Sequence, residues 1–194
     1  MKMTIFNTPI LSPLLHLLAK AGLRLTGWKV EGQFPSLPKF VVIGAPHTSN
    51  WDFLMFLAVI LQQRADVRFM GKSELFNKPF GWFFYWCGGI PVDRSKAQGL
   101  VEQMVQACDK SDCFVLTIAP EGTRNKVREW KRGFYHIAKN SRIPVAMAVV
   151  DGMRKVVGLG KIYHPTDDIE ADLKAIQAFF TGMVGINPIG TSEL

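Results

Sequence analysis

A histidine and an aspartate, His47 and Asp52, stand five positions apart in the stretch GAPHTSNWDF. An apolar run that favours a buried strand precedes them, and an apolar run that favours a helix follows. A turn and the start of a helix can bring the carboxylate onto the imidazole ring. Such a contact would fix the ring tautomer and leave the other ring nitrogen as a general base. The alternative is an aspartate that serves only the helix dipole, beside an unrelated histidine.

Other chemistries fit this segment less well. A serine hydrolase would use Ser49, which lies only two residues from His47 and is not part of a G-x-S-x-G motif. A metal site would need a third ligand that the neighbouring residues do not offer, and the histidines lack zinc-ligand spacing. We therefore expect no metal and no prosthetic group. A base without a protein nucleophile implies that a substrate hydroxyl is the attacking group.

Three further polar segments, GKSE, VDRS and PEGTR, also follow predicted strands. They contribute Lys72, Arg94, Glu121, Gly122, Thr123 and Arg124. Ligands of open α/β sheets bind beyond the carboxyl ends of the strands, so these groups are expected to converge on one rim. Gly122 permits close backbone approach and could help to stabilise an oxyanion, and Arg124 offers a forked cation that suits phosphate. Each segment alone is more typical of ordinary loop charge, but the three together favour an anion site.

The pattern of the whole chain predicts an α/β fold with a mainly parallel sheet flanked by helices. Strands are expected at WKVEG, KFVVIGA, VRFMGK, GIPV, CFVLTIAP and IPVAMAVV, and longer helices at WDFLMFLAVILQQ, KAQGLVEQMVQACDK and DDIEADLKAIQAFFTGM. Several of these strands are apolar without alternation, which is typical of strands buried on both faces. A hairpin-like pair is expected at RKVVGLG and KIYHP. We predict a single α/β domain over residues 28–185 and a tail over 186–194.

Residues 1–27 are predicted to contain an N-terminal amphipathic helix, with Ser12 as its N-cap and Pro13 in its first turn. One face carries His16, Lys20 and Arg24, and another carries Leu11, Leu14, Leu18, Ala21 and Leu25. Two interpretations are open, a surface helix packed on the domain or a helix that lies in a membrane interface. The prolines and the short length make a membrane span improbable.

Composition and charge indicate the class of partner. The chain has 194 residues, 48% of them hydrophobic, and a net charge of +7. The positive charge suits lipid headgroups, a phosphorylated substrate, nucleic acid or an acidic carrier protein. The aromatic residues are concentrated in apolar runs and are not interleaved with basic residues, which argues against nucleic acid. The 3 cysteines form no C-x-x-C pair, which fits a reducing compartment.

The motifs HTSNWD, GGIPVDR, PEGTR and IPV resemble, in order and approximate spacing, the four blocks of the glycerolipid acyltransferases. This family includes the 1-acylglycerol-3-phosphate acyltransferases, and the resemblance covers roughly residues 40–149. It implies that His47 and Asp52 deprotonate an acceptor hydroxyl, which attacks a fatty-acyl thioester directly. It also implies that Arg94 and the Glu121–Arg124 block, with Lys72 beside them, hold the acceptor phosphate. Departures at Pro46, Pro91, Ala119 and Met147 leave the choice among lipid hydroxyls open.

The resemblance implies transfer of a fatty-acyl group to a lysophospholipid or glycerol-phosphate hydroxyl, in phospholipid biosynthesis or remodelling. The acyl donor would be acyl-CoA or acyl carrier protein, and the other partners would be membrane lipids. The expected location is the cytoplasmic face of the inner membrane, peripheral or monotopic. The alternative is a non-catalytic phospholipid-binding protein that uses the same basic rim. The intact pair of His47 and Asp52 argues against that alternative, because binding alone needs no base.

Overall fold

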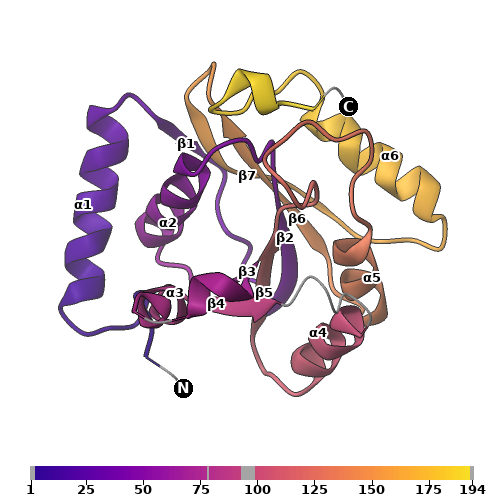
Figure 1. Cartoon of the computed structure of the whole chain (residues 1–194), viewed down its shortest axis with the longest axis horizontal. Coiled ribbons are helices and arrows are strands. Elements are labelled where there is room, and N and C mark those ends of the chain that lie inside the picture. Colours follow the sequence, from indigo (N-terminus) through magenta and orange to yellow (C-terminus); the bar gives the residue numbers. More distant parts are fainter. Residues whose placement is uncertain (1–2, 78, 93–98, 193–194) are drawn as a thin grey trace.

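The computed structural model describes residues 3–77, 79–92 and 99–192, which form a seven-stranded sheet with helices on both faces (Figure 1). The helices are α1 (Leu11–Leu25), α2 (Trp51–Gln63), α3 (Gly81–Trp86), α4 (Leu100–Asp109), α5 (Gly133–Asn140) and α6 (Ile169–Phe180). The strands are β1 (Lys29–Glu31), β2 (Lys39–Ala45), β3 (Arg68–Lys72), β4 (Gly89–Val92), β5 (Phe114–Ile118), β6 (Val145–Asp151) and β7 (Val156–Tyr163). The described residues also include the short 3₁₀ helices η1 (Ser73–Phe76) and η3 (Pro188–Gly190).

The sheet is mainly parallel, which confirms the fold class predicted from the sequence. The strand order is β1-β7-β6-β2-β5-β3-β4. The strands β6, β2, β5, β3 and β4 are parallel, β7 pairs antiparallel with β6, and β1 runs parallel to β7. Ile43 of β2 lies opposite Ile118 of β5. The loops that follow these two central strands therefore leave the same edge of the sheet side by side.

The predicted hairpin-like pair near the C-terminus is wrong, because β7 is one continuous strand. Two glycines within this strand allow neighbouring elements to pack closely against it. A Cβ atom at Gly158 would lie 2.9 Å from the carbonyl carbon of Glu31 in β1, and one at Gly160 would lie 2.9 Å from Cε2 of Phe179. A side chain at either position would therefore collide with a neighbouring element.

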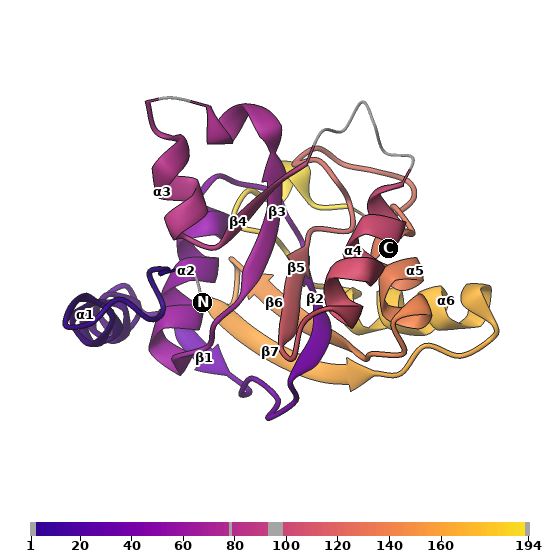
Figure 2. The same ribbon diagram turned by 90° about the horizontal axis from the view of Figure 1, so that it is seen from below.

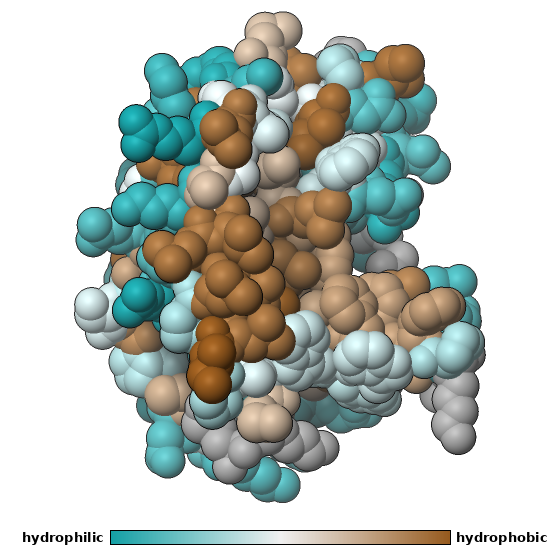
Figure 3. All heavy atoms as spheres, turned by 90° about the vertical axis from the view of Figure 1, so that its left-hand side faces the viewer, coloured by the Kyte–Doolittle hydropathy of each residue, from teal (hydrophilic) through white to brown (hydrophobic). Residues whose placement is uncertain are grey.

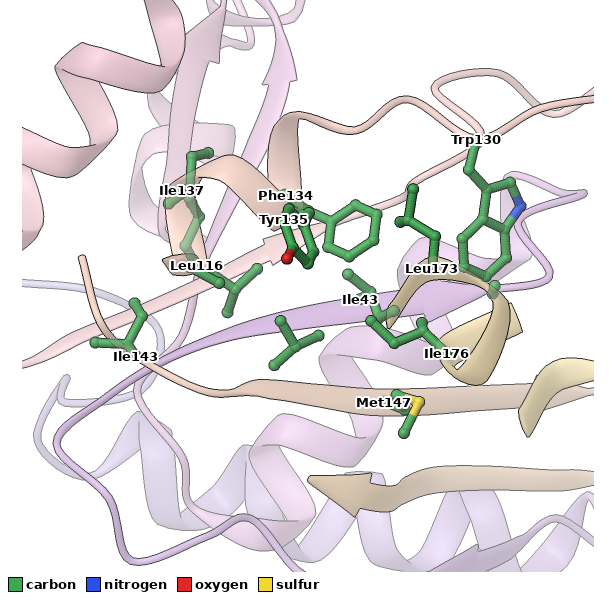
Figure 4. Close-up of a cluster of buried hydrophobic side chains, with 14 of the residues drawn as sticks. Ile43, Leu116, Trp130, Phe134, Tyr135, Ile137, Ile143, Met147, Leu173 and Ile176 are labelled. Atoms are coloured by element: carbon green, nitrogen blue, oxygen red, sulfur yellow. The ribbon is translucent and has the colours of Figure 1, made fainter. Parts of the chain in front are cut away.

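The face of the sheet covered by α4, α5 and α6 is a closely packed core (Figure 4). Its fully buried members include Ile43, Leu116, Phe134, Ile137, Met147 and Ile176. Burying a side chain of this size stabilises a fold by about 1.5–3 kcal/mol. These residues anchor the central strands β2, β5 and β6, which carry the loops at the carboxyl edge.

The opposite face is covered by α1, α2 and α3, and α1 is the outermost of the three (Figure 2). Helix α1 packs inward through Leu15, Ala19 and Leu23. Nδ1 of His16 lies 3.0 Å from the carbonyl oxygen of Leu61 in α2, so His16 does not belong to a solvent-facing polar stripe as predicted. The predicted N-cap is also wrong, because Ser12 lies within α1 and its hydroxyl donates to the carbonyl of Phe6.

The outward side of α1 is apolar. Exposed aromatic side chains of α3, and that of Phe80 just before α3, extend this apolar surface. We define this apolar face as Ile10, Leu14, Leu17, Leu18, Leu25, Phe80, Trp82 and Tyr85, all of which are exposed. Figure 3 shows the hydrophobic side chains gathered on the side of the molecule that α1 covers. Lys20 and Arg24 of the same helix are also exposed. Within the described residues, no helix has both the length and the apolarity needed to cross a bilayer.

Candidate active site

The turn between β2 and α2 holds the histidine and the aspartate in contact. Nδ1 of His47 lies 3.0 Å from Oδ2 of Asp52, as the spacing predicts. The imidazole is 27% exposed, whereas the aspartate side chain is 5% exposed. With Nδ1 directed at the carboxylate, Nε2 is the ring nitrogen available to a substrate. The pair therefore has the arrangement of a general base and the group that orients it.

Three consecutive main-chain N–H groups of this turn donate to two carboxylates. Those of Thr48 and Ser49 donate to Oδ2 of Asp52 at 2.7 and 2.8 Å. That of His47 donates to both carboxylate oxygens of Glu121 at 3.1 Å. Oδ1 of Asp52 is buried and has no hydrogen-bond partner among the residues that the structure describes. The main chain thus fixes the aspartate, which in turn fixes the imidazole.

Glu121, predicted to help hold a phosphate, instead lies beneath the turn. It is 4% exposed and directs its carboxylate at the main chain of His47. Burial raises the pKa of Glu121 from 4.5 to about 7, and the nearby charge of Asp52 adds to the rise. The hydrogen bonds from the main chain, that of His47 first, oppose this rise without cancelling it.

Because its pKa is raised, Glu121 should contribute less to the free energy of unfolding at neutral pH than at acidic pH. A folded-state pKa above the ordinary value gives a contribution that is complete below about pH 4.5 and is lost as the pH rises through about 7. Because one pKa unit corresponds to about 1.4 kcal/mol, the loss is about 3 kcal/mol.

Urea unfolding of wild type and Glu121→Gln at pH 4.5, 6 and 8 should show this loss of stability. The free energy of unfolding of the wild type should fall relative to that of the variant as the pH rises. Glu129→Gln, at an exposed position on the same loop, is the control, and a difference independent of pH would contradict the prediction.

The loop after β5 presents Arg124 at the site. Gly122 has a φ of 67°, and a Cβ atom there would lie 2.9 Å from the Lys131 side chain, so glycine suits this turn. The N–H of Gly122 donates to the carbonyl of Ala119 at 3.1 Å, and therefore already has an acceptor within the turn. The Thr123 hydroxyl is half-buried and accepts the N–H of Asn125 at 3.4 Å. Arg124 is exposed and lines the cavity described below.

The remaining predicted cations are placed differently. Lys72 ends β3 at the same edge of the sheet, but its ammonium lies 2.9 Å from Oε1 of Glu74 and it does not line the cavity. Both side chains of this pair are 57% exposed, which makes it a weak surface pair. Arg94 lies outside the described residues. The structure therefore brings Arg124 to the rim of the cavity and leaves the role of Arg94 as a prediction from the sequence.

An apolar cavity of about 380 Å³ begins at the histidine and extends between α2 and the sheet. Its polar lining includes His47, Asp52 and Arg124 at the carboxyl edge. Its apolar lining includes Val42, Phe53, Phe56, Val59, Ile60, Phe69, Met70, Ile118, Val157 and Leu159. Phe34, which precedes the amino end of β2, lines the far part. A cavity of this size with few polar groups is typical of a site for a largely apolar ligand.

Two features of the site were not predicted from the sequence. Residues 185–192, within and beside the segment expected to be a tail, lie against the turn that carries His47, and the main-chain N–H of Asn187 donates to the Thr48 hydroxyl at 3.0 Å. The cavity wall from Phe34 was also missed. Neither has a local signal, because the first is a contact from a main-chain N–H to a side chain distant in sequence and the second is one aromatic residue in a loop.

No group of three or more histidine, cysteine, aspartate or glutamate residues that could hold a metal ion occurs in the part of the chain that the structure describes. The side chains that the site offers for chemistry are the imidazole of His47, the carboxylates of Asp52 and Glu121, and the guanidinium of Arg124. A base beside an apolar cavity and a guanidinium can deprotonate a hydroxyl of a ligand that combines an apolar chain with an anionic group.

Comparison with known proteins agrees with this class of site. The family model Acyltransferase matches residues 28–150, which is more than half of the chain. The protein therefore belongs to the acyltransferase family, as the four motifs indicated.

Two curated relatives carry the name 1-acyl-sn-glycerol-3-phosphate acyltransferase. The one from Streptococcus pneumoniae is 27% identical, over 68% of this chain and 52% of that protein. The one from Saccharomyces cerevisiae is 31% identical, over 66% of this chain and 44% of that protein. The chain thus spans about half the length of these relatives.

A similar fold occurs in the crystal structure of the 1-acyl-sn-glycerophosphate (LPA) acyltransferase, PlsC, from Thermotoga maritima. The match has a TM-score of 0.62 and 20% sequence identity, and it covers 87% of this chain and 76% of that one. At this level of identity the comparison supports the α/β architecture.

Proposed function

We propose that this protein is an O-acyltransferase that moves a fatty-acyl group from an acyl thioester to the hydroxyl of a lysophospholipid or glycerol-phosphate acceptor. The observation that carries this proposal is the pair of His47 and Asp52 at the opening of an apolar cavity. The base supplies what a hydroxyl attack requires, and the cavity supplies a place for an acyl chain. The names of the curated relatives support the same reaction class.

The geometry of the pair supports a direct transfer with His47 as the base. Nε2 of His47 takes the proton of the acceptor hydroxyl while the hydroxyl oxygen bonds to the carbonyl carbon of the thioester. The carbon–sulfur bond then breaks, and the departing thiolate takes the proton from the imidazolium. Asp52 stabilises the imidazolium between these two transfers. The products are an ester and a thiol, and the base returns to its initial state without a metal or prosthetic group.

The apolar cavity is the proposed site of the donor's acyl chain. Its lining from α2, β2, β3 and β7 is mainly apolar. The thioester carbonyl would then lie at the opening, beside His47, while its CoA or carrier-protein portion extends outside the cavity. Acyl-CoA and acyl carrier protein both satisfy this arrangement, so the choice between them is left to the assay.

An acyl-transfer assay on the purified protein tests the function directly. It should pair acyl-CoA and acyl carrier protein donors with lysophosphatidate, other lysophospholipids and glycerol 3-phosphate. We expect transfer to at least one phosphorylated acceptor. Binding of phospholipid without transfer to any acceptor would favour the non-catalytic alternative.

Arg124 is the proposed ligand of the acceptor phosphate, so Arg124→Ala should mainly weaken acceptor binding. A bidentate contact between a guanidinium and phosphate contributes about 1.5–3 kcal/mol. The acceptor KM should therefore rise about 10- to 100-fold with a smaller change in kcat. Arg124→Lys should restore only part of the affinity, since an ammonium lacks the planar fork.

Arg128→Ala is the matched control for this prediction, because Arg128 is exposed on the same loop and does not line the cavity. Its saturation curve for the acceptor should match that of the wild type. Equal curves for the Arg124 and Arg128 variants would remove phosphate recognition from Arg124.

A position on the membrane surface is proposed from the apolar face, and the cytoplasmic face of the inner membrane is the proposed side. The exposed leucines of α1 could enter the headgroup boundary, and Lys20 and Arg24 on the same helix could contact anionic lipids. A basic residue near an anionic surface contributes about 1 kcal/mol, which salt weakens. This position would bring the site close to acceptors that stay in the bilayer.

The double substitution Leu14→Glu and Leu18→Glu should lower binding to anionic vesicles at least about tenfold. It places two charges on the apolar face and spares the packed side of α1. Vesicle flotation measures the effect, and Ile162→Glu, at an exposed position on β7, is the control. Unchanged binding by the folded double variant would place the membrane contact elsewhere.

A further inference from the structure

Residues 185–192, which we name the C-terminal clasp, join the two loops that form the site. The N–H of Asn187 donates to Oγ1 of Thr48, in the loop after β2, at 3.0 Å. The hydroxyl of Ser192 accepts the N–H of Val127, in the loop after β5, at 3.0 Å. These contacts bridge 139 and 65 positions of sequence. The clasp thus links the loop of the base to the loop of the guanidinium.

Two glycines let the clasp approach both loops closely. A Cβ atom at Gly185 would lie 2.5 Å from Cγ2 of Thr48. A Cβ atom at Gly190 would lie 2.6 Å from the carbonyl oxygen of Arg124 and 3.2 Å from Cβ of Thr48. Neither glycine has a positive φ. Glycine is therefore explained by the lack of room for a side chain, and not by the backbone conformation. The clasp therefore packs against the side chain of Thr48 and the main chain of Arg124.

The clasp is itself ordered by local contacts. The N–H of Gly185 donates to the Thr191 hydroxyl at 3.0 Å, which closes the segment on itself. The N–H of Gly152, just after β6, donates to the carbonyl of Val184 at 2.7 Å. The start of the clasp is therefore fixed at the end of the central strand β6. Through its contact with the clasp, Thr48 is held in place relative to that strand.

Thr48 is the link between the clasp and the base. It is 4% exposed, and its own N–H donates to Oδ2 of Asp52 at 2.7 Å. The same oxygen contacts Nδ1 of His47 at 3.0 Å. Any shift of Thr48 would therefore alter the orientation of the carboxylate and of the ring.

We propose that the C-terminal clasp is a positioning element that, through Thr48, holds His47 and Asp52 in contact and sets their place relative to Arg124. The proposal rests on the proposed function for its kinetic consequences, whereas the contact of His47 with Asp52 can be measured without it. No clasp residue touches a reacting atom in the proposed mechanism. Their effect is on geometry, to which transfer reactions are sensitive, because a displacement of about 1 Å can slow a reaction about 100-fold.

The test compares two substitutions of Thr48 in the full chain. Thr48→Val keeps the shape against Gly185 and Gly190 and removes the hydroxyl that accepts from Asn187. Thr48→Ser keeps the hydroxyl. We expect the valine variant to lower kcat about 10- to 100-fold with little change in the KM of the acyl donor. The serine variant should recover most of the wild-type kcat.

A second variant leaves Thr48 in place. Gly190→Ala introduces a methyl group against the carbonyl of Arg124, so it should displace the clasp and lower kcat in the same direction. Ile189→Ala is its control, because Ile189 is 83% exposed on the same segment. Wild-type kinetics for both Thr48→Val and Gly190→Ala would overturn the proposal.

A spectroscopic signal separates this proposal from the proposed function. The Nδ1 proton of His47, hydrogen-bonded to Asp52, should give a downfield NMR resonance that is absent in His47→Ala. It should persist in Thr48→Ser and move upfield or vanish in Thr48→Val, although Asp52, Glu121 and Arg124 are present in both. Failure of every acyl-transfer assay would reject the proposed function alone. An unchanged resonance in Thr48→Val would reject the clasp.

Discussion

Replacement of His47 by alanine should remove nearly all acyl transfer and leave the fold intact. The imidazole is the group in the described site with a free nitrogen at the cavity opening, and Asp52 already holds its other nitrogen. Without it, the acceptor hydroxyl would have to attack while still protonated. A positioned general base contributes about 10²- to 10⁴-fold to a rate. We therefore expect kcat to fall about 10⁴-fold, at the upper end of that range.

The fold should survive this change because the ring is partly exposed and lies at the edge of the sheet, away from the core of α4, α5 and α6. Thermal unfolding of the purified variant checks this expectation beside the assay. His164→Ala is the matched control, since His164 is an exposed histidine just after β7. Wild-type turnover by a folded His47→Ala protein would exclude the proposed mechanism.

The sheet could be predicted because its central strands carry their own signal. The runs KFVVIGA and IPVAMAVV are apolar without alternation, and they became β2 and β6, buried on both faces. The helix predicted at WDFLMFLAVILQQ matches α2 over its full length. The strand β7, which lies between β1 and β6, was predicted as two short strands. Its glycines Gly158 and Gly160 pack closely against neighbouring elements, and a close approach between distant segments has no local signal in the sequence.

The orientation of α1 could not be read from its periodicity. A helix with a leucine face and a polar face can pack by either, and the choice depends on what the neighbouring element offers. Here Leu15, Ala19 and Leu23 pack in clusters that include residues of α2. The imidazole of His16 is within hydrogen-bond distance of the carbonyl of Leu61. Leu14, Leu17, Leu18 and Leu25 are left exposed, and this exposure is the physical basis for proposing a membrane contact.

The site was predictable where it is local and unpredictable where it is not. His47 and Asp52 lie within one turn, so their contact follows from spacing. Glu121 shares its segment with Arg124, and the sequence alone assigned both to phosphate. The structure places the two side chains differently. Glu121 is 4% exposed and accepts the main-chain N–H of His47, whereas Arg124 is exposed and lines the cavity.

Replacement of Asp52 by asparagine should remove most of the activity with little loss of stability. The amide oxygen can take the place of Oδ2 and still accept the N–H groups of Thr48 and Ser49, so the turn should keep its form. The negative charge that stabilises the imidazolium of His47 is lost, however. By comparison with the triad of serine proteases, where the same change lowers kcat about 10⁴-fold, we expect a loss of about 10²- to 10⁴-fold.

The kinetic pattern of Asp52→Asn distinguishes an orienting charge from a merely structural carboxylate. An orienting charge acts in the transition state, so kcat should fall while the KM values for donor and acceptor change little. The folded protein should lose little stability, because Oδ1 is buried without a partner in the described residues and a buried charge is itself unfavourable. Asp112→Asn, at an exposed position before β5, should behave as wild type in both respects. A variant of Asp52 that unfolds readily but turns over normally per folded molecule would assign the carboxylate to the turn alone, and His47 would then act as a base without it.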